Sequence, residues 1–407
     1  ASSIYGARAA NGVIVISTKR GQTGKTKVSY NGSMKITPKP DMGYLDLMNS
    51  SELVDMQIEG FNYYHKDYKN LNPRYAVNPV EALLYRHENG ELNDAQLSDA
   101  LLPYRNRDNK KQIEDEFART GIVHQHNLSI SGGTEKNRYI ATINYMGNYG
   151  NQKYQSKDRI GFSLKDDVEL YKWLSADFGV TGSFSRDKGD NGAGDYENLM
   201  MDYPSYFMLR DEQGNPLSIQ RLKSDYELER LQSIGLMDEV YNPIENRREE
   251  NYHNNENYYR LHAGLKFNII EGLTLDLKYQ TEGTYTKKSK HYTNMSYTVR
   301  SMINDAAQYN QETGELTLNV PKGGQLDETR QEAYSYTMRA QLNFNRSFGK
   351  HAITALGGAE RRLVRLTGTT NYYMGYDDNS LGIKPINSLV MSPVDGTEAL
   401  NGSFNWV

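Results

Sequence analysis

Three short segments carry residues whose types and spacing could support phosphate or metal chemistry. The first, Gly21 to Thr26 (GQTGKT), contains the second half of a phosphate-binding-loop pattern. A true loop of this kind needs a glycine five positions before Gly24, where Lys19 stands, and a helix after it. Here an alternating, strand-like segment follows instead. We therefore interpret Gly21 to Thr26 as a linker.

The other two segments could hold metal ions. His124 and His126 share a face if their segment is a strand, but no third ligand is near in the sequence. Two histidines at a solvated strand end are the favoured interpretation. The segment Asp187 to Asp195 (DKGDNGAGD) is rich in oxygen ligands but lacks EF-hand spacing, and a simple Asp/Gly turn is favoured over a calcium site. We predict no metal site and no cofactor, with calcium in this loop as the lesser alternative.

Tyrosine is the residue type best suited to bind a substrate, with 32 copies in 407 residues. A flat ring with a polar tip can stack on a sugar face, and long loops are where capture would occur. The alternative is packing against neighbouring loops or a partner. No nucleophile elbow or paired catalytic set stands out, so we predict a non-enzyme; a barrel-shaped lipase or protease would need a Ser/His/acid set. The candidate substrate-binding residues in polar segments are Tyr196, Tyr203, Tyr206, Tyr372 and Tyr373.

These candidates must be positioned by strands, because apolar and polar residues alternate from Lys25 onward. Val28, Tyr30 and Met34 fall on one face, for about ten residues in all, the length that a tilted membrane strand needs. We predict ten such strands. The alternation recurs, weakly in the last two segments, at 124–131, 139–149, 159–165, 174–184, 259–269, 273–285, 336–345, 353–359 and 404–406.

The connections alternate in length. Short turns are predicted at 132–137, 171–173, 271–272 and 349–350, and long loops at about 37–121, 186–255, 287–330 and 366–402, with a modest link near Asn151. Outer-membrane barrels have short periplasmic turns and long extracellular loops, whereas soluble sheets have no reason to gather long loops at one end. The prediction is an all-β, transmembrane antiparallel barrel; the runner-up is a soluble secreted β-sandwich adhesin. Ser51 to His65 reads as a short helix within the first loop.

Composition narrows the function classes. The longest apolar run, Val13 to Ile16, is far below the ~18 residues of a membrane-spanning helix, and mean hydropathy is −0.77. A net charge of −4 does not indicate a nucleic-acid-binding protein. The chain has no cysteine and therefore no disulfide. The chain opens without a signal peptide and ends on the alternating run Ser403 to Val407, so both ends look truncated and we expect a segment of a longer protein.

Several segments together resemble one transporter family. The opening ASSIYGARAANGVIVISTKRG is similar to the end of the plug domain in TonB-dependent outer-membrane transporters. RAANGVIVI followed by GKTKVSYNG, and then NLSISGGTEKNRYIATINYMGNYG, resemble the SusC/RagA branch found in Bacteroidetes. The long first loop containing LDLMNSSELVDM fits that branch too. The segments occur in the family's order along nearly the whole chain.

The resemblance implies a 22-stranded barrel around a folded plug, with residues 1–24 as the end of the plug and residues 25–407 as the first ten or so strands. It implies TonB-dependent import across the cell outer membrane, a SusD-like surface lipoprotein, the TonB complex and membrane lipid as partners, and a homodimer of transporter–lipoprotein pairs. The substrate would be an oligosaccharide or a peptide, and the tyrosines favour the oligosaccharide. A non-energised porin is the alternative within the same fold.

Overall fold

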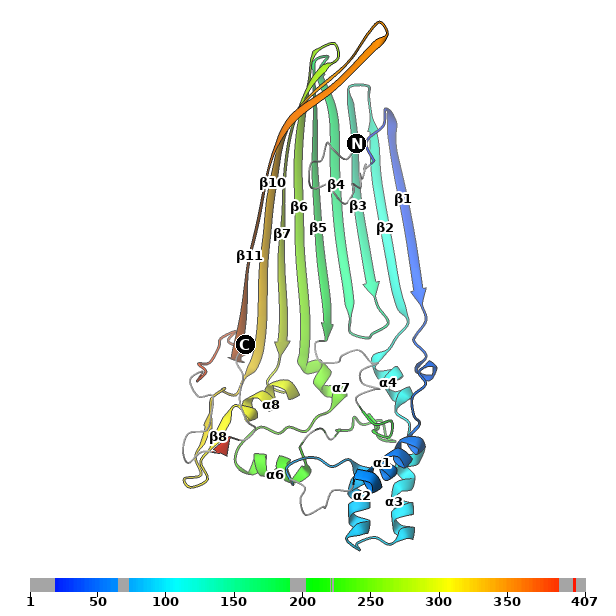
Figure 1. Cartoon of the computed structure of the whole chain (residues 1–407), viewed down its shortest axis with the longest axis vertical. Coiled ribbons are helices and arrows are strands. Elements are labelled where there is room, and N and C mark those ends of the chain that lie inside the picture. Colours follow the sequence, from blue (N-terminus) through cyan, green and yellow to red (C-terminus); the bar gives the residue numbers. More distant parts are fainter. Residues whose placement is uncertain are drawn as a thin grey trace.

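The computed structural model describes residues 19–64, 73–190, 203–219, 221, 223–387 and 398–399. Its main body is one nine-stranded antiparallel sheet in which almost every strand pairs with its neighbours in the chain, in the order β1-β2-β3-β4-β5-β6-β7-β10-β11 (Figure 1). β1 and β11 form the two edges. The strands are β1 (Gly24–Thr37), β2 (Gly121–Gly133), β3 (Asn137–Tyr149), β4 (Ser156–Tyr171), β5 (Leu174–Asp190), β6 (Glu250–Ile270), β7 (Leu273–Tyr292), β10 (Gly324–Phe348) and β11 (His351–Tyr376).

The pairing register separates the side chains onto two faces. Tyr30 pairs with Leu128, Leu128 with Ile143, and Ile143 with Phe162, so these rings and aliphatic chains lie in one row. We call this side the apolar face, and the side that carries Arg159, Lys165, Asp177, Arg260 and Arg339 the polar face. The predicted alternation is confirmed, because the pairing register keeps apolar side chains on one face and polar side chains on the other.

Large side chains of the apolar face are exposed and not covered by other parts of the described structure. Val28 is 63% exposed, Ile143 52% and Met338 50%, values that are unusual for large apolar side chains in a water-soluble fold. The compact hydrophobic clusters lie elsewhere, among the loops. The strand side chains thus gain their apolar surroundings from outside the sheet, as in a membrane barrel.

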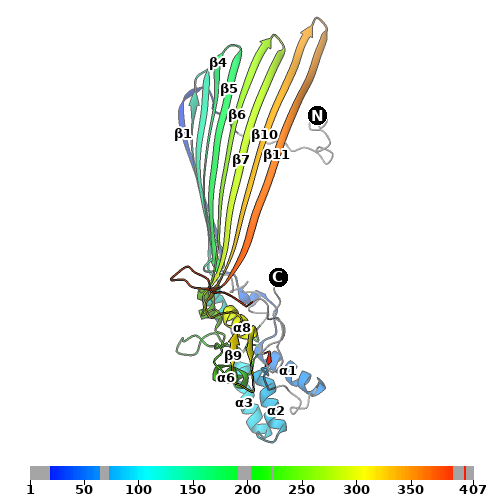
Figure 2. The same cartoon turned by 90° about the vertical axis from the view of Figure 1, so that its left-hand side faces the viewer.

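All the long connections lie at one end of the strands (Figures 1 and 2). At the other end, hairpin turns of a few residues join β2 to β3, β4 to β5, β6 to β7 and β10 to β11. The helices of the long connections are η2 (Met42–Tyr44), α1 (Ser50–Tyr64), α2 (Pro79–Glu88), α3 (Asp94–Asn106), α4 (Lys110–Phe117), α6 (Asp225–Ser233), α7 (Pro243–Asn246), η4 (Arg247–Glu249) and α8 (Tyr297–Asp305). Short strands β8 (Ala307–Tyr309), β9 (Leu316–Leu318) and β12 (Glu398–Ala399) form a small second sheet.

Local signals explain where the loop helices begin. The Asn78 side chain accepts the Glu81 backbone N–H, and Pro79 occupies the first turn of α2, where a missing N–H costs nothing. Asn93 and Gln96 form a reciprocal capping box at the start of α3. No helix of the described residues is both long and apolar enough to cross a membrane.

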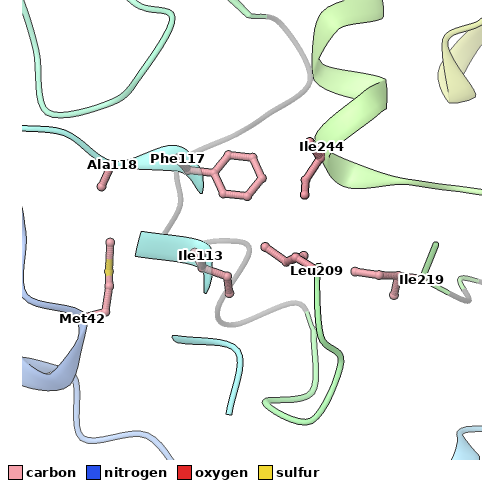
Figure 3. Packing of buried hydrophobic residues seen from close by; sticks show 7 residues of the cluster. All are labelled: Met42, Ile113, Phe117, Ala118, Leu209, Ile219 and Ile244. Carbon is pink, nitrogen blue, oxygen red and sulfur yellow. The ribbon is translucent and has the colours of Figure 1, made fainter. Parts of the chain in front are cut away.

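The loop assembly has its own hydrophobic cores. One cluster joins η2, α4, α7 and the chain near Leu209; its seven buried side chains are Met42, Ile113, Phe117, Ala118, Leu209, Ile219 and Ile244 (Figure 3). A second cluster packs α1, α2 and α3 around Val54, Val80, Leu84, Leu101 and Tyr206. The long connections are therefore folded structures, not extended loops.

The predicted strand order holds, but several strand ends differ. The helix predicted from Ser51 to His65 is confirmed as α1, and eight strands agree in order. β6 begins at Glu250 and β10 at Gly324, before the predicted starts at 259 and 336, so the third long connection spans 293–323 and not 287–330. β11 was predicted to end near residue 366, but it runs to Tyr376 because β10 is equally long and supplies a hydrogen-bonding partner throughout. The fourth long connection therefore begins after Tyr376 and not at 366. The predicted strand at 404–406 and the apolar run Val13 to Ile16 lie outside the described residues.

Candidate functional site

The polar face carries a cluster of opposite charges where the chain enters the sheet. Arg20 precedes β1, and its Nη1 donates to Asp167 Oδ1 on β4 over 2.9 Å. The two residues line a hollow of about 300 Å³ together with charged side chains from four strands. Its ionisable lining is Arg20, Lys165, Asp167, Asp177, Arg260, His262 and Lys278.

A glycine makes this cluster compact. The His262 ring lies over Gly179 of the neighbouring strand, where a Cβ would come within 2.0 Å of His262 Cε1. This position brings His262 Nε2 to 3.8 Å from Asp177 Oδ2. Two other cations of the polar face have partners on the strands: Arg159 Nε donates to Ser183 Oγ over 2.9 Å, and Arg339 donates to Gln341. The polar face is thus a hydrogen-bonded wall with cations available to a segment inside it.

A second hollow, of about 700 Å³, lies in the loop assembly between α2, α3, α4 and the chain at 206–219. We call it the loop pocket. Aromatic rings and charged or amide groups share its wall, the mixture that suits a hydroxylated or polar organic ligand. The lining includes Tyr104, Arg107, Gln112, Tyr206, Phe207, Arg210, Asp211, Glu212 and Gln213.

Gln112 and Arg210 fix the wall of the loop pocket. Gln112 Oε1 accepts the backbone N–H groups of Leu209 (2.7 Å) and Arg210 (3.1 Å), and its Nε2 donates to the Arg210 carbonyl over 3.1 Å. The Arg210 guanidinium donates to Glu116 Oε2 through Nε and Nη2, at 3.1 and 2.8 Å. Arg210 Nη1 also donates to the Gly214 carbonyl over 2.8 Å. These bonds hold the turn that follows Arg210 against α4.

The wall of the loop pocket carries a carboxylate, a guanidinium group and aromatic rings. Hydrogen bonds from Asn215, first its side chain, hold the pKa of Asp211 below its usual range and keep this carboxylate ionised as an acceptor. Burial raises the pKa of the Tyr206 phenol, which donates to Gln57 Oε1 over 3.1 Å. The Arg107 guanidinium lies 5.5 Å from the centre of the Tyr104 ring. The pocket therefore offers an anionic acceptor, a cationic donor and an aromatic ring.

The structure separates the five predicted substrate tyrosines. Tyr206 is 1% exposed, with rings of Tyr104 and Phe207 at 5.4 and 5.2 Å, so its environment is the packing alternative. Tyr203 packs against the first hydrophobic cluster and stacks on Tyr241 at 6.4 Å. Tyr196 lies outside the described residues.

Tyr372 and Tyr373 lie in β11 and not in a loop, and they point to opposite faces. Tyr372 pairs with Asp327, on the polar face, and is 59% exposed. Tyr373 pairs with Leu326 on the other face. Of this pair, only Tyr372 lies on the face that carries Arg159, Lys165, Arg260 and Arg339.

The two metal hypotheses give no ligand cluster in the described part of the chain, where no group of three or more metal-binding side chains occurs. His124 and His126 lie on the apolar face: their Nδ1 and Nε2 atoms are 3.1 Å apart, and His126 Nδ1 lies 2.6 Å from the Tyr30 hydroxyl. Asp187 pairs with Asn254 at the end of β5, and the calcium candidate loop beyond Asp190 lies outside the described residues.

Sequence reasoning missed Gln112, Arg210 and Glu116. Their roles depend on contacts between positions 94 to 98 residues apart, for which an alternating pattern gives no signal. The helix caps at Asn78 and Asn93 were readable and would have located α2 and α3, and thereby one side of the pocket.

Comparison with known proteins finds that the chain is similar to TonB-dependent receptors. No family model matches it. It is 24% identical over 233 residues to TonB-dependent receptor P39 of Formosa agariphila (54% of the chain, 19% of the relative) and 22% identical over 378 residues to receptor P3 of the same organism (90% and 30%). It is 28% identical over 151 residues to TonB-dependent receptor SusC of Bacteroides thetaiotaomicron, 37% of the chain and 11% of SusC.

Solved structures share the fold. The RagAB peptide transporter matches with a TM-score of 0.65 at 20% identity, over 96% of this chain and 41% of that one. The RagAB peptide importer in the closed-closed state also gives 0.65, at 18% identity over 95% and 40%. The chain spans less than a third of the length of the curated relatives named above.

Proposed function

Because the chain belongs to the SusC/RagA-type TonB-dependent receptors of the bacterial outer membrane, we propose that it forms part of a TonB-dependent importer of a nutrient. The observation that carries the proposal is the two-faced sheet. Its apolar side suits lipid, and its polar side holds Arg20, from the segment before β1, in an ion pair with Asp167. A plug that must move during transport needs such polar, reversible contacts with the wall, because an exposed ion pair contributes only about 0–1 kcal/mol.

The proposed substrate is an oligosaccharide. The loop pocket combines the Tyr104 ring with Asp211 and Arg107, which can accept from and donate to sugar hydroxyls. Tyr372 adds an exposed ring on the polar face, near the end of β11 from which the fourth long connection leaves. The alternative substrate is a peptide, which could use the same groups through its backbone N–H and carbonyl groups.

The partners in this proposal are the TonB complex, a SusD-like surface lipoprotein over the loop end, and a second copy of the transporter–lipoprotein pair. All the helices of the described loops lie at the loop end of the sheet, where such a lipoprotein would dock (Figure 1). Residues 1–24 would complete the plug and residues 25–407 the first part of the barrel wall.

Uptake in living cells tests energised transport. Cells that express the full-length protein should accumulate a fluorescent oligosaccharide, and deletion of TonB should abolish the uptake. Uptake that continues unchanged without TonB would indicate an open porin and reject the proposal.

Calorimetry of the purified transporter–lipoprotein complex tests the substrate class. Oligosaccharide pools should release heat and peptide pools should not. The reverse result would replace oligosaccharide by peptide and leave the transporter assignment in place. Tyr372→Ala should weaken binding of the correct pool, while Tyr373→Ala, on the opposite face, is the matched control.

A further inference from the structure

The apolar face is not uniformly filled: a shallow hollow of about 520 Å³ lies across β6, β7, β10 and β11. Two alanines form its floor: Ala340 of β10 pairs with Ala359 of β11. On its other side, Ala340 pairs with Leu277 of β7. Larger side chains form the walls. The residues of the apolar face that line it are Ala263, Leu265, Leu277, Tyr279, Met338, Ala340, Ala359 and Arg361.

One end of the hollow is charged. Arg361 pairs with Met338 and therefore points to the apolar face, as does Arg365, which pairs with Tyr334. Both arginines are exposed, and neither forms an ion pair with a residue that the structure describes. The two Cα atoms are about 13 Å apart along the strand, close enough for two long side chains to reach one group.

The position of Arg361 along β11 matches the outer boundary of the apolar band. Ile353, Ala355 and Ala359 occupy this face between the hairpin turn and Arg361. A tilted membrane strand crosses the hydrocarbon in about 9–11 residues, and Arg361 stands ten positions after His351. An arginine at the interface costs about 0–1 kcal/mol, against about 2–4 kcal/mol at the midplane.

Two neighbouring cations on the same face share one carboxylate. Glu328 lies 2.6 Å from Lys287 Nζ and 2.6 Å from Arg330 Nε, farther toward the loop end. Arg361 differs in having the apolar hollow beside it, and Arg365 stands four positions farther along the same face, diagonally across from Glu332. Charge complementarity therefore favours an occupant that is anionic at one end and apolar at the other.

We propose that this hollow binds a membrane lipid, with an acyl chain over Ala340 and Ala359 and the headgroup phosphate on Arg361 and Arg365. Guanidinium groups bind phosphate oxygens in a bidentate manner. The floor alanines admit the chain because they leave the space that a larger side chain would fill. The site lies on the outer side of the wall and is separate from the loop pocket and the polar face.

Native mass spectrometry of the full-length transporter in detergent tests the site, with dioleoylphosphatidylglycerol and dioleoylglycerol as probes. The wild type should retain the phospholipid in preference to the diacylglycerol, which has the same chains and no phosphate. The double variant Arg361→Gln/Arg365→Gln should lower phospholipid retention by about tenfold or more. Equal retention of both probes, or retention unchanged in the double variant, would refute the proposal.

Two further variants separate the site from general effects. Arg362→Gln removes a neighbouring positive charge on the polar face, since Arg362 pairs with Thr337, and should leave retention unchanged. Ala359→Leu fills the floor and should lower retention while both arginines remain. A loss of retention in Arg362→Gln as large as in the double variant would show that overall charge, and not this site, holds the lipid.

Discussion

At the scale of single residues, Gln112 shows how much of the loop pocket depends on one amide. Its side chain satisfies the N–H groups of Leu209 and Arg210 and the carbonyl of Arg210. Leu209 is 2% exposed, so these backbone groups have little access to water if the amide is removed. A buried group left without its partner costs about 1–3 kcal/mol.

Gln112→Ala should therefore loosen the pocket wall. We expect the free energy of local opening of residues 203–219 to fall by about 1–3 kcal/mol, measured by amide hydrogen exchange at Leu209 and Arg210. Gln213→Ala removes an exposed side chain from the same pocket and should change the exchange little. Unchanged exchange in Gln112→Ala would show that other contacts hold this segment.

The tyrosines packed in the loop assembly should make its stability fall at high pH. Burial raises the pKa values of Tyr85, Tyr206, Tyr241 and Tyr297. Their folded-state values lie above the unfolded value of about 10. The stability that they contribute is fully present below pH 10 and is lost as the pH rises through the folded-state values.

A tyrosinate absorbance titration should show this difference directly. In the native protein, a group of tyrosines should ionise only above pH 10, together with loss of loop structure in near-ultraviolet circular dichroism. In urea, all tyrosines should ionise in a single transition near pH 10. Identical native and urea curves would contradict the burial of these rings.

At the scale of elements, the strands could be predicted from the sequence and the loop assembly could not. Alternation such as Val28-Ser29-Tyr30 is local, so it reveals a strand and its two faces without knowledge of partners. The end of β11 was missed because its apolar alternation fades after residue 359, although pairing with β10 continues to Tyr376. The folding of the loops depends on contacts such as Asn109 with Pro204 and Phe207, which no periodicity encodes.

The dependence on long-range contacts also explains why the predicted substrate-binding tyrosines have such different environments. Tyrosine content indicated which residue type could stack on a ligand, but not which rings would be buried. Tyr206 belongs to the cluster that joins α1, α2 and α3, because its ring fits between Tyr104 and Phe207. Tyr372 and Tyr373 are adjacent in sequence, yet strand geometry sends them to opposite faces.

One carboxylate joins the loop assembly to the sheet. Glu250 begins β6 and is 2% exposed. Its Oε1 accepts from Asn246 Nδ2 (3.0 Å), Ser296 Oγ (2.7 Å) and Thr298 Oγ1 (2.8 Å), and the latter two lie at the start of α8. Both long connections that flank the β6–β7 hairpin therefore meet at this group.

Glu250→Ala should detach α8 from the strands. Each hydrogen bond to a charged acceptor contributes about 1.5–3 kcal/mol, and the variant loses three of them. Limited proteolysis should therefore cleave near residues 296–305 while the strands stay intact. Glu250→Gln keeps an acceptor oxygen and should be milder. Glu256→Ala, an exposed position on the same strand, is the control. Equal cleavage of all three variants would rule out this role for Glu250.

At the scale of the whole molecule, the central claim is that one face of the sheet contacts lipid and the other contacts water. The 407 residues contain no cysteine, so single cysteines can report on each face. Leu342→Cys and Gln341→Cys are adjacent in β10 and point to opposite sides: Leu342 pairs with Leu275 on the apolar face, and Gln341 with Asp276 on the polar face.

In the full-length protein in liposomes, with any other cysteine replaced, a charged maleimide should label Gln341→Cys from the aqueous interior. Leu342→Cys should stay unlabelled, because the hydrocarbon excludes a charged reagent and suppresses formation of the thiolate. A lipid-soluble maleimide should reverse the order. In detergent, partial labelling of Leu342→Cys is expected as the micelle replaces the bilayer. Equal labelling of both positions by the charged reagent in liposomes would mean that water reaches both faces, as in a soluble sandwich, and would overturn the membrane orientation from which the transport proposal and the lipid site both start.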